Sequence, residues 1–572
     1  MLRAIAGLSI LLSLVFGVLS SQCCSAQQKD TRAYVGFLPF TSSSSLKWAP
    51  EQAIPGLISW ELYFIPRIDQ VEMRRLLVCM QVDQLRRPAD LKNASGYGKL
   101  ADALGVDYLV TGRITSCDKK RTKFVLYVYR SGGDKPLLRS QYDSDTSGIQ
   151  QAASTAARDI ARAVGIPPVG LSLKVRPEVE WDALRSMERS MRYASQDNAG
   201  DLDFRKAAEH AVNASAACPE CPYAAILAVG YSRSRDLAFS GLEDLLRRWP
   251  GNALLLRRLV ELHVNASDFV NALQYARQWT ERDPSSLCAR GIRRVVERKA
   301  KAANSLQPSG AAAQGSGANP AVGGPGSVGA AGPRESTQPA VAACALPAGV
   351  SGWRAYLDIA ECCAMDNDVE QVRGWFRPLE KRRESSAYAN VVVGQLYEHL
   401  GHYGDAAASY EAAREINPNS FYIQIGLART YLAAGEPVSA LQAVEVVIEN
   451  WPDKTDGHWL AARIYKKINR DDEAISELEI VKRLDPDDRI SREYLAGEYV
   501  RAGRILEGVR EFSKTIPQAR RAIMVTALIL TAIFLVVLIW VAFLVRGVLA
   551  PDRSRAARRR KDHDADLQDS GG

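Results

Sequence analysis

Cys218 and Cys221, separated by a proline and a glutamate, have the spacing in this chain that most suggests chemistry. Two such cysteines exchange thiols and disulfides when one thiolate is exposed at the start of a helix that follows a strand. Here the pair falls in a loop between segments with helical patterning, and the nearby sequence offers no further zinc ligands. We therefore expect a structural disulfide or two free thiols, and redox activity stays open as an alternative.

The residue patterns of common enzyme classes are absent from the sequence. The six histidines are scattered, and there is neither a His-Glu-x-x-His pair nor a Gly-x-Ser-x-Gly sequence. His399 and His402 are three residues apart but lie on either side of a predicted helix end at Gly401. Gly105 and Gly112 lack the spacing of a phosphate-binding loop and indicate turns. We expect no enzymatic activity, no cofactor and no metal site.

A period of 34 residues organises the C-terminal half of the chain. Small residues would let two helices approach closely, and glycine or asparagine would break the run between them. Proline would close each unit, because it cannot continue a helix. The pattern therefore predicts a stack of helix pairs. Its repeated positions are Pro418, Pro452 and Pro486; Tyr397, Tyr431, Tyr465 and Tyr499; Ala406, Ala440 and Ala474; and Gly401, Gly435, Asn469 and Gly503.

These residue types at these offsets resemble the tetratricopeptide repeat (TPR). The resemblance implies an interaction scaffold, because stacked helix pairs share one core and present an extended concave surface. Three units starting at residues 387, 421 and 455 fit well, a fourth from Arg489 is cut short at Pro517, and a weaker unit precedes them, which predicts an array over 353–517. Pro250 and Pro284 are also 34 residues apart and predict a degenerate array over 178–300.

In TPR proteins the first helix of each unit lines the concave face. By matching positions, the resemblance implies a peptide-binding groove formed by Tyr388, Gln395, Glu398, Arg429, Trp459, Arg463, Lys466 and Arg501. The basic members favour an extended acidic or C-terminal peptide. The lysine and asparagine of a carboxylate clamp are not matched at Val391 or Gln395. A solvated surface without a partner is the alternative interpretation of the same residues.

Residues 31–168 predict a compact α/β domain. Apolar or alternating runs at 34–40, 105–114, 123–129 and 137–142 indicate strands. The short segment from Val71 predicts the end of a strand followed directly by the start of a helix. Helical patterning occupies residues 50–64, 99–104 and 149–164.

Three motifs of this domain resemble the envelope domain shared by the TolB amino-terminal and CsgG-like families. They are Val-Gly-Phe-Leu-Pro-Phe in the first strand, Val-Glu-Met-Arg-Arg-Leu-Leu from residue 71, and Leu-Ala-Asp-Ala-Leu-Gly-Val-Asp-Tyr-Leu-Val-Thr-Gly-Arg-Ile from residue 100. The resemblance covers residues 34–165. It implies an exported, non-enzymatic part of a cell-envelope assembly.

Two segments have compositions unlike those of globular domains. Residues 1–26 combine an arginine, an apolar run and a small-x-small end, which predicts a secretory signal peptide cleaved after Ala26. Lipidation at Cys23 or Cys24 is the less favoured alternative. Residues 301–350 are dominated by glycine, alanine, proline and serine and predict a flexible linker.

Residues 522–545 are apolar and uncharged. As a helix they would extend about 36 Å, enough to cross a hydrocarbon core of roughly 30 Å, so they predict a transmembrane helix. The tail, 546–572, begins with a basic cluster and ends acidic, and the positive-inside rule places it in the cytoplasm. The net charge of +8 owes much to this cluster, so it does not indicate nucleic-acid binding.

The sequence therefore predicts a multidomain protein: an N-terminal α/β sandwich domain, then all-α TPR solenoid arrays, then one C-terminal transmembrane helix. We expect a single-pass protein of the cell membrane, bacterial by its composition, with the bulk of the chain extracytoplasmic. Its expected function is to act as a scaffold in a cell-envelope assembly, binding protein or peptide partners near the membrane. An envelope redox factor using Cys218 and Cys221, or a membrane sensor, is the alternative.

Overall fold

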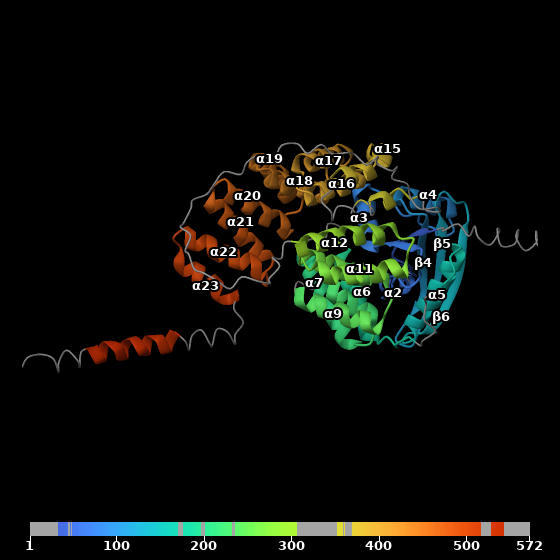
Figure 1. Ribbon diagram of the computed structural model, residues 1–572, viewed down its shortest axis with the longest axis horizontal. Helices are drawn as coiled ribbons and strands as arrows, with labels where there is room; N and C mark the ends of the chain where they lie inside the picture. The colour runs from blue at the N-terminus through green and yellow to red at the C-terminus, as the bar shows by residue number, and fades with distance from the viewer. Residues whose placement is uncertain are drawn as a thin grey trace, which may run out of the picture. The chain divides into compact units, whose positions relative to one another are not determined.

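The computed structural model describes residues 32–43, 46, 48–169, 176–195, 201–230, 235–305, 352–357, 360, 369–515 and 528–542 (Figure 1). The chain divides into two compact units between Ile468 and Asn469. The predicted signal peptide and tail lie outside the described residues, as does the predicted linker from residue 306 onward.

The first unit is built around a six-stranded mixed sheet. The strand order is β3-β1-β4-β5-β6, and the short β2 also pairs with β4. β1 runs parallel to β3 and β4, whereas β4, β5 and β6 form an antiparallel meander. The strands are β1 (Ala33–Phe37), β2 (Thr41–Ser42), β3 (Ile68–Val71), β4 (Tyr108–Cys117), β5 (Arg121–Arg130) and β6 (Pro136–Asp145).

Strand β1 is buried on both faces of the sheet: successive side chains of a strand point to opposite faces, and all five residues of β1 are buried. Val35 and Phe37 of β1 pack into one core with α2 and α5, whereas Tyr34 and Leu38 pack into another with α3 and α4. A strand buried on both faces gives a continuous apolar run, as residues 34–40 do. The predicted α/β domain is confirmed in its mixed sheet and helices. These helices are α2 (Ala53–Leu62), α3 (Met73–Val82), α4 (Ala94–Leu104) and α5 (Ile149–Ala163).

The first helical array packs against the α2 and α5 face. Leu184 of α6 and Ala214 of α7 belong to the same core cluster as Val35. The buried Arg32, which directly precedes β1, bridges Asp69 and Asp283 at 2.8 Å each and so ties the sheet to the end of α11. The helices are α6 (Trp181–Ala194), α7 (Asp201–Ala217), α8 (Pro222–Gly230), α9 (Arg235–Arg248), α10 (Ala253–Asn265), α11 (Phe269–Arg282) and α12 (Leu287–Ser305).

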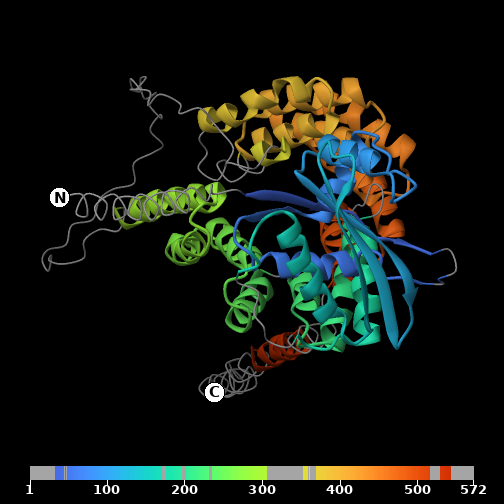
Figure 2. The same ribbon diagram turned by 90° about the vertical axis from the view of Figure 1, so that its right-hand side faces the viewer.

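The second array begins in the first unit and packs on the opposite, α3 and α4, side of the sheet (Figure 2). Asp83, at the end of α3, accepts hydrogen bonds from the Ser386 hydroxyl at 2.6 Å and the Tyr388 backbone N–H at 2.8 Å. Asn417 donates to the carbonyl of Val82 at 2.8 Å. The helices of this part are α14 (Val369–Phe376), η1 (Arg377–Leu379), α15 (Glu380–Arg383), α16 (Ala387–His399), α17 (Tyr403–Ile416), α18 (Phe421–Ala434), α19 (Pro437–Asn450) and α20 (Thr455–Lys467).

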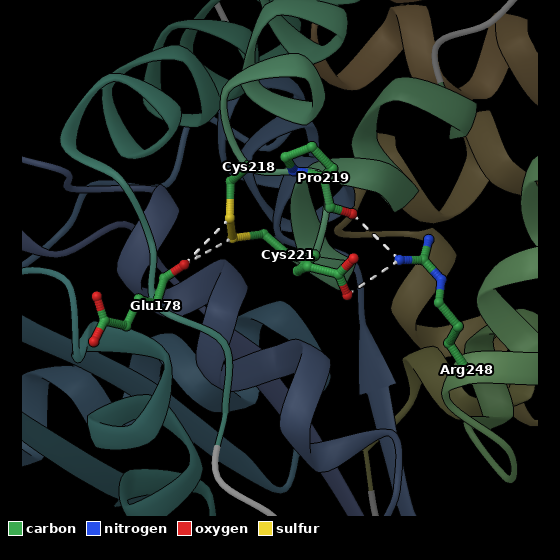
Figure 3. The surroundings of a disulfide bond; sticks show 6 residues. Glu178, Cys218, Pro219, Cys221 and Arg248 are labelled. Carbon is green, nitrogen blue, oxygen red and sulfur yellow. Dashed lines mark hydrogen bonds and ion pairs between the residues drawn. A yellow bond between two sulfur atoms is a disulfide. The ribbon is translucent and has the colours of Figure 1, made fainter.

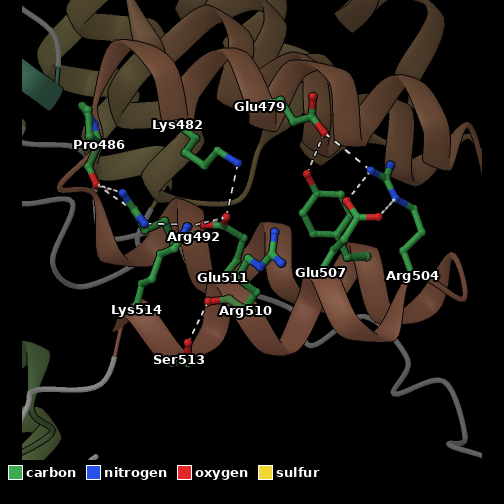
Figure 4. Close-up of polar contacts among 11 residues, drawn as sticks. Glu479, Lys482, Pro486, Arg492, Arg504, Glu507, Arg510, Glu511, Ser513 and Lys514 are labelled. Carbon is green, nitrogen blue, oxygen red and sulfur yellow. Dashed lines mark hydrogen bonds and ion pairs between the residues drawn. The ribbon is translucent and has the colours of Figure 1, made fainter.

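The second unit contains α21 (Asp471–Leu484), α22 (Arg489–Arg501) and α23 (Ile505–Thr515). Figure 4 shows Glu511 of α23 near Lys482 of α21 at 3.4 Å and Arg492 of α22 at 3.5 Å, contacts that join the three helices. Lys514 of α23 itself also pairs with Glu511, at 2.9 Å. Of the predicted membrane span, the structure describes only residues 528–542, which are helical. Among the described residues, no helix is long and apolar enough to cross a membrane.

The 34-residue period matches the observed helices. The first helices of successive pairs begin at residues 387, 421, 455 and 489, as the sequence predicts. Gly401, Gly435 and Gly503 have φ values of 76°, 84° and 78°, and Asn469 has 60°. Glycine enters this left-handed region freely and asparagine tolerates it, so the period places suitable residues at each turn between paired helices.

Candidate functional site

Glu398 and Arg429, two of the predicted groove residues, form an ion pair between α16 and α18. Arg429 donates to Glu398 through Nε at 2.9 Å and Nη2 at 2.6 Å, and the Tyr410 hydroxyl donates to the same carboxylate at 3.0 Å. The hydrogen bond to Glu398 raises the pKa of Arg429. An incoming carboxylate would therefore have to compete with Glu398 for this guanidinium.

Trp459, Arg463 and Lys466 lie on α20 at positions that share one side of a helix. The Arg463 guanidinium lies over the Trp459 ring, 4.8 Å from its centroid. Arg463 is exposed, whereas Trp459 and Lys466 are half-buried. The arrangement offers a flat aromatic surface beside an accessible positive charge.

The remaining predicted groove residues are dispersed. Tyr388 is buried, and its hydroxyl accepts a hydrogen bond from Arg354 at 3.0 Å. Gln395 is exposed on α16. Arg501 belongs to the second unit, where it pairs with Glu498 of its own helix at 2.8 Å. The structure thus brings together Glu398 with Arg429 and Trp459 with Arg463.

A cavity of about 680 Å³ lies within the first unit, where the sheet domain and the two arrays meet. Its walls come from α3, α10, α12, α16 and α18, and Tyr388 and Gln395 contribute to its lining. Among the described lining residues, five are cationic, against the single carboxylate of Glu261. The cations are Arg74, Arg75, Arg257, Arg258 and Lys299. The Arg-Arg doublets at 74–75 and 257–258 were the available sequence signal for this cavity, which the repeat pattern alone does not predict.

Two of these arginines are neutralised by neighbouring carboxylates. Arg257 donates to Glu261 at 2.8 Å, and Arg258 contacts Glu261 at 3.1 Å and Glu72 at 2.6 Å. Burial raises the pKa of Glu72, but the surrounding arginines, Arg258 first, outweigh it and leave that pKa below its usual value. Glu72 is therefore expected to be ionised at neutral pH.

Arg74 and Lys299 have a different environment. The Arg74 guanidinium lies over the Phe204 ring, 4.3 Å from the ring centroid. The Lys299 ammonium lies 5.8 Å from the centroid of the Phe269 ring. Within the part of the chain that the structure describes, neither has an ion pair with a carboxylate. Such cations retain more of their capacity to bind an anion.

Cys218 and Cys221 form a disulfide in the loop between α7 and α8 (Figure 3). Both residues are buried, and their sulfur atoms lie 3.3 and 3.5 Å from the carbonyl oxygen of Glu178. Arg248 holds the loop by donating to the Pro219 carbonyl at 3.2 Å. Thiol exchange requires an accessible sulfur, so this burial favours a structural role.

The described residues contain no group of three or more histidine, cysteine or acidic side chains that could hold a metal ion. What they do contain is helix pairs in register. The fold defines a helical-repeat protein, and stacked repeats of this kind generally present extended surfaces.

The Tetratricopeptide repeat family model matches residues 399–453, which contain α17, α18 and α19. This match confirms the TPR part of the resemblance, whereas the TolB and CsgG-like resemblance stays a prediction.

No curated protein sequence matches the chain. Among solved structures, the chain is similar to MamA 41-end from Desulfovibrio magneticus RS-1, at 18% identity over 30% of this chain and 96% of that chain, with a TM-score of 0.27. It is also similar to YrrB, a TPR protein with an unusual peptide-binding site, at 18% identity, 30% and 90% coverage and a TM-score of 0.25.

Proposed function

We propose that this protein is a membrane-anchored scaffold that binds protein partners outside the cytoplasm as part of a cell-envelope assembly. The observation that carries the proposal is the register of helix pairs starting at residues 387, 421, 455 and 489, together with the family match at 399–453. Stacked pairs of this kind present extended concave surfaces to their partners.

The proposed contact surface is the groove centred on α18 and α20. Arg463 over Trp459 provides a charge and an aromatic plane, while Arg429 is already bound to Glu398. Substituting Arg429 would also disturb this internal ion pair. Arg463→Glu is therefore the cleaner test of partner binding.

The experiment is a cross-linking pull-down from membranes with the full-length chain. Partners captured by the wild-type protein should be lost with Arg463→Glu and retained with Lys467→Glu, which changes an exposed lysine on the same helix outside the predicted groove. Equal capture by both variants would refute the groove. A loss with both would point to a non-specific charge effect.

Membrane anchoring rests on the apolar run 522–545 and the basic residues after it. The preceding α23 exposes Ile505, Leu506 and Val509, apolar side chains suited to a location near lipid. Carbonate extraction and protease accessibility test this arrangement. The chain should stay in the membrane pellet, and truncation after residue 521 should release it. Release of the untruncated chain would contradict the proposal.

The redox alternative is the less favoured function, because both sulfurs of Cys218 and Cys221 are buried. Thiol trapping separates the two possibilities. A pair that stays oxidised and forms no mixed disulfide with other proteins supports a structural role. A membrane sensor would instead require the tail, so deletion of residues 546–572 should leave partner binding unchanged if the scaffold function is correct.

A further inference from the structure

The cavity between the sheet domain and the two arrays concentrates positive charge on two of its sides. Arg74 and Arg75 come from α3, and Arg257, Arg258 and Lys299 come from α10 and α12. Part of this charge is compensated by ion pairs, because Arg257 pairs with Glu261 and Arg258 pairs with both Glu261 and Glu72. The cavity nevertheless keeps an excess of cations, and two of them rest on aromatic rings instead of carboxylates.

The side formed by the second array has a different character. Val391, Val392 and Leu396 of α16 and Tyr422 of α18 line it with apolar surface, and Gln395 and His399 add polar groups. The volume of about 680 Å³ falls within the range of about 300–1,000 Å³ that is usual for ligand pockets. A suitable ligand must therefore combine negative charge with an apolar portion.

We propose that this cavity binds an acidic peptide segment, with carboxylates directed at Arg74 and Lys299 and an apolar side chain against α16. Arginine presents a planar fork that fits carboxylates, and lysine supplies a point charge. A bare phosphate would satisfy the cations but leave the apolar wall of Val391 and Leu396 unused. The proposal does not depend on the groove at Arg463 or on membrane anchoring.

A ligand bound there would touch all three parts of the first unit. Between the first array and the start of α20, the described residues provide a direct ion pair, Lys454 with Asp203 at 2.9 Å. A peptide that contacts α3, α12 and α16 together would add a second bridge. Because it would favour the arrangement in which these walls are close, its binding should reduce backbone exchange in the wall helices.

The test uses the full-length chain in neutral detergent and a fluorescein-labelled peptide, Glu-Leu-Asp-Leu-Glu, with Gln-Leu-Asn-Leu-Gln as its uncharged control. Fluorescence anisotropy should show saturable binding of the acidic peptide alone, weakened by added salt. Lys299→Glu and Arg74→Glu should each weaken binding by about tenfold or more, since hydrogen bonds to charged groups contribute about 1.5–3 kcal/mol. Lys299→Gln should cause a smaller loss and guards against misfolding caused by charge reversal.

Matched controls locate the site. Lys301→Glu, an exposed residue on α12 outside the cavity, and Arg463→Glu should both leave the affinity unchanged. Hydrogen exchange in the presence of the acidic peptide should slow in α12 and α16. Equal binding of the uncharged peptide, or an equal loss with Lys301→Glu, would overturn the proposal. Displacement by an equal concentration of inorganic pyrophosphate would assign the cavity to a phosphate-bearing ligand and would also overturn it.

Discussion

Replacing Gly426 by alanine should destabilise the second array despite the higher helix propensity of alanine. A Cβ at this position would lie 2.4 Å from Cε1 and 2.7 Å from Cζ of Tyr410, whose ring is fully buried. The ring has little room to move away, because a Cβ at Gly394 would meet its other edge at 2.9 Å. The Tyr410 hydroxyl is also held by Glu398 at 3.0 Å. Helix α16 and helix α18 thus approach each other across one tyrosine.

The magnitude follows from two opposing effects. Overpacking a core costs about 1–3 kcal/mol, and replacing glycine by alanine inside a helix returns up to about 1 kcal/mol. We expect a net loss of about 1–2 kcal/mol, or a fall in melting temperature of about 2–8 °C. The matched variant Gly404→Ala, whose Cβ would meet nothing within 4 Å, should raise the melting temperature.

Calorimetry of the full-length chain and hydrogen exchange in α16 and α18 would measure both effects. Gly426→Ala should speed exchange in these helices, and combining it with Tyr410→Leu should cost less than the sum of the two single changes, because the smaller side chain makes room for the new methyl group. If Gly426→Ala stabilised the protein as much as Gly404→Ala, the ring would not be confined as described.

Three further substitutions test other contacts. Asp283→Asn should cost about 2–3 kcal/mol at neutral pH, since it weakens the buried pair with Arg32. Burial raises the pKa of Asp283, but its hydrogen bonds with Arg32 outweigh burial and leave the folded-state pKa below the usual value. The stability advantage of the wild-type protein is therefore present above the unfolded-state pKa of about 4 and is lost as the pH falls through the lower folded-state pKa. The denaturation midpoints of the wild-type protein and the variant should converge at that low pH. Tyr499→Phe removes a 2.6 Å hydrogen bond to Glu479 and should cost about 0.5–1.5 kcal/mol by urea denaturation, and an unchanged midpoint would mean that water replaces the bond fully. Asn469→Ala places a side chain with a Cβ and no local hydrogen bonding at φ 60° and should cost about 1 kcal/mol, whereas Asn469→Gly should be tolerated in the same assay.

The repeat was predictable because its determinants are local and recur. Each left-handed turn needs a glycine or asparagine, and each helix pair needs small residues, so the same residue types return at the same offset. Ala406, Ala440 and Ala474 are all fully buried, as their shared phase predicts. The strands of the N-terminal domain were predictable from apolar runs such as 34–40, which fit burial on both faces.

The packing of the arrays on the sheet could not be predicted in the same way, because each contact occurs once. Asp83 and Ser386 are 303 positions apart, and Arg32 and Asp283 are 251 apart, with no periodic pattern linking either pair. For the same reason, the repeat pattern could not predict which of the groove residues already have an internal partner. Arg429 and Arg463 occupy equivalent repeat positions, and both are predicted to line the groove. In the structure Arg429 forms an ion pair with Glu398, whereas Arg463 is exposed and lies over Trp459.

This difference changes where a partner should be sought. A basic residue chosen by repeat position alone counts as a binding residue only if no internal carboxylate already holds it. By that criterion the best candidates for binding an acidic partner, among the described residues considered, are Arg463 in the groove and Arg74 and Lys299 in the cavity. Arg463 and Arg74 lie over aromatic rings, and Lys299 lies near one. The cations of the two sites lie on different helices, Arg463 on α20 and Arg74 and Lys299 on α3 and α12. A partner with two acidic segments could therefore occupy both sites, and linking the segments would raise its apparent affinity without any new contact. The single variants Arg463→Glu and Lys299→Glu should then each reduce binding of such a partner, and the double variant should abolish it. If either single variant abolished binding, the two sites would not act as separate contacts.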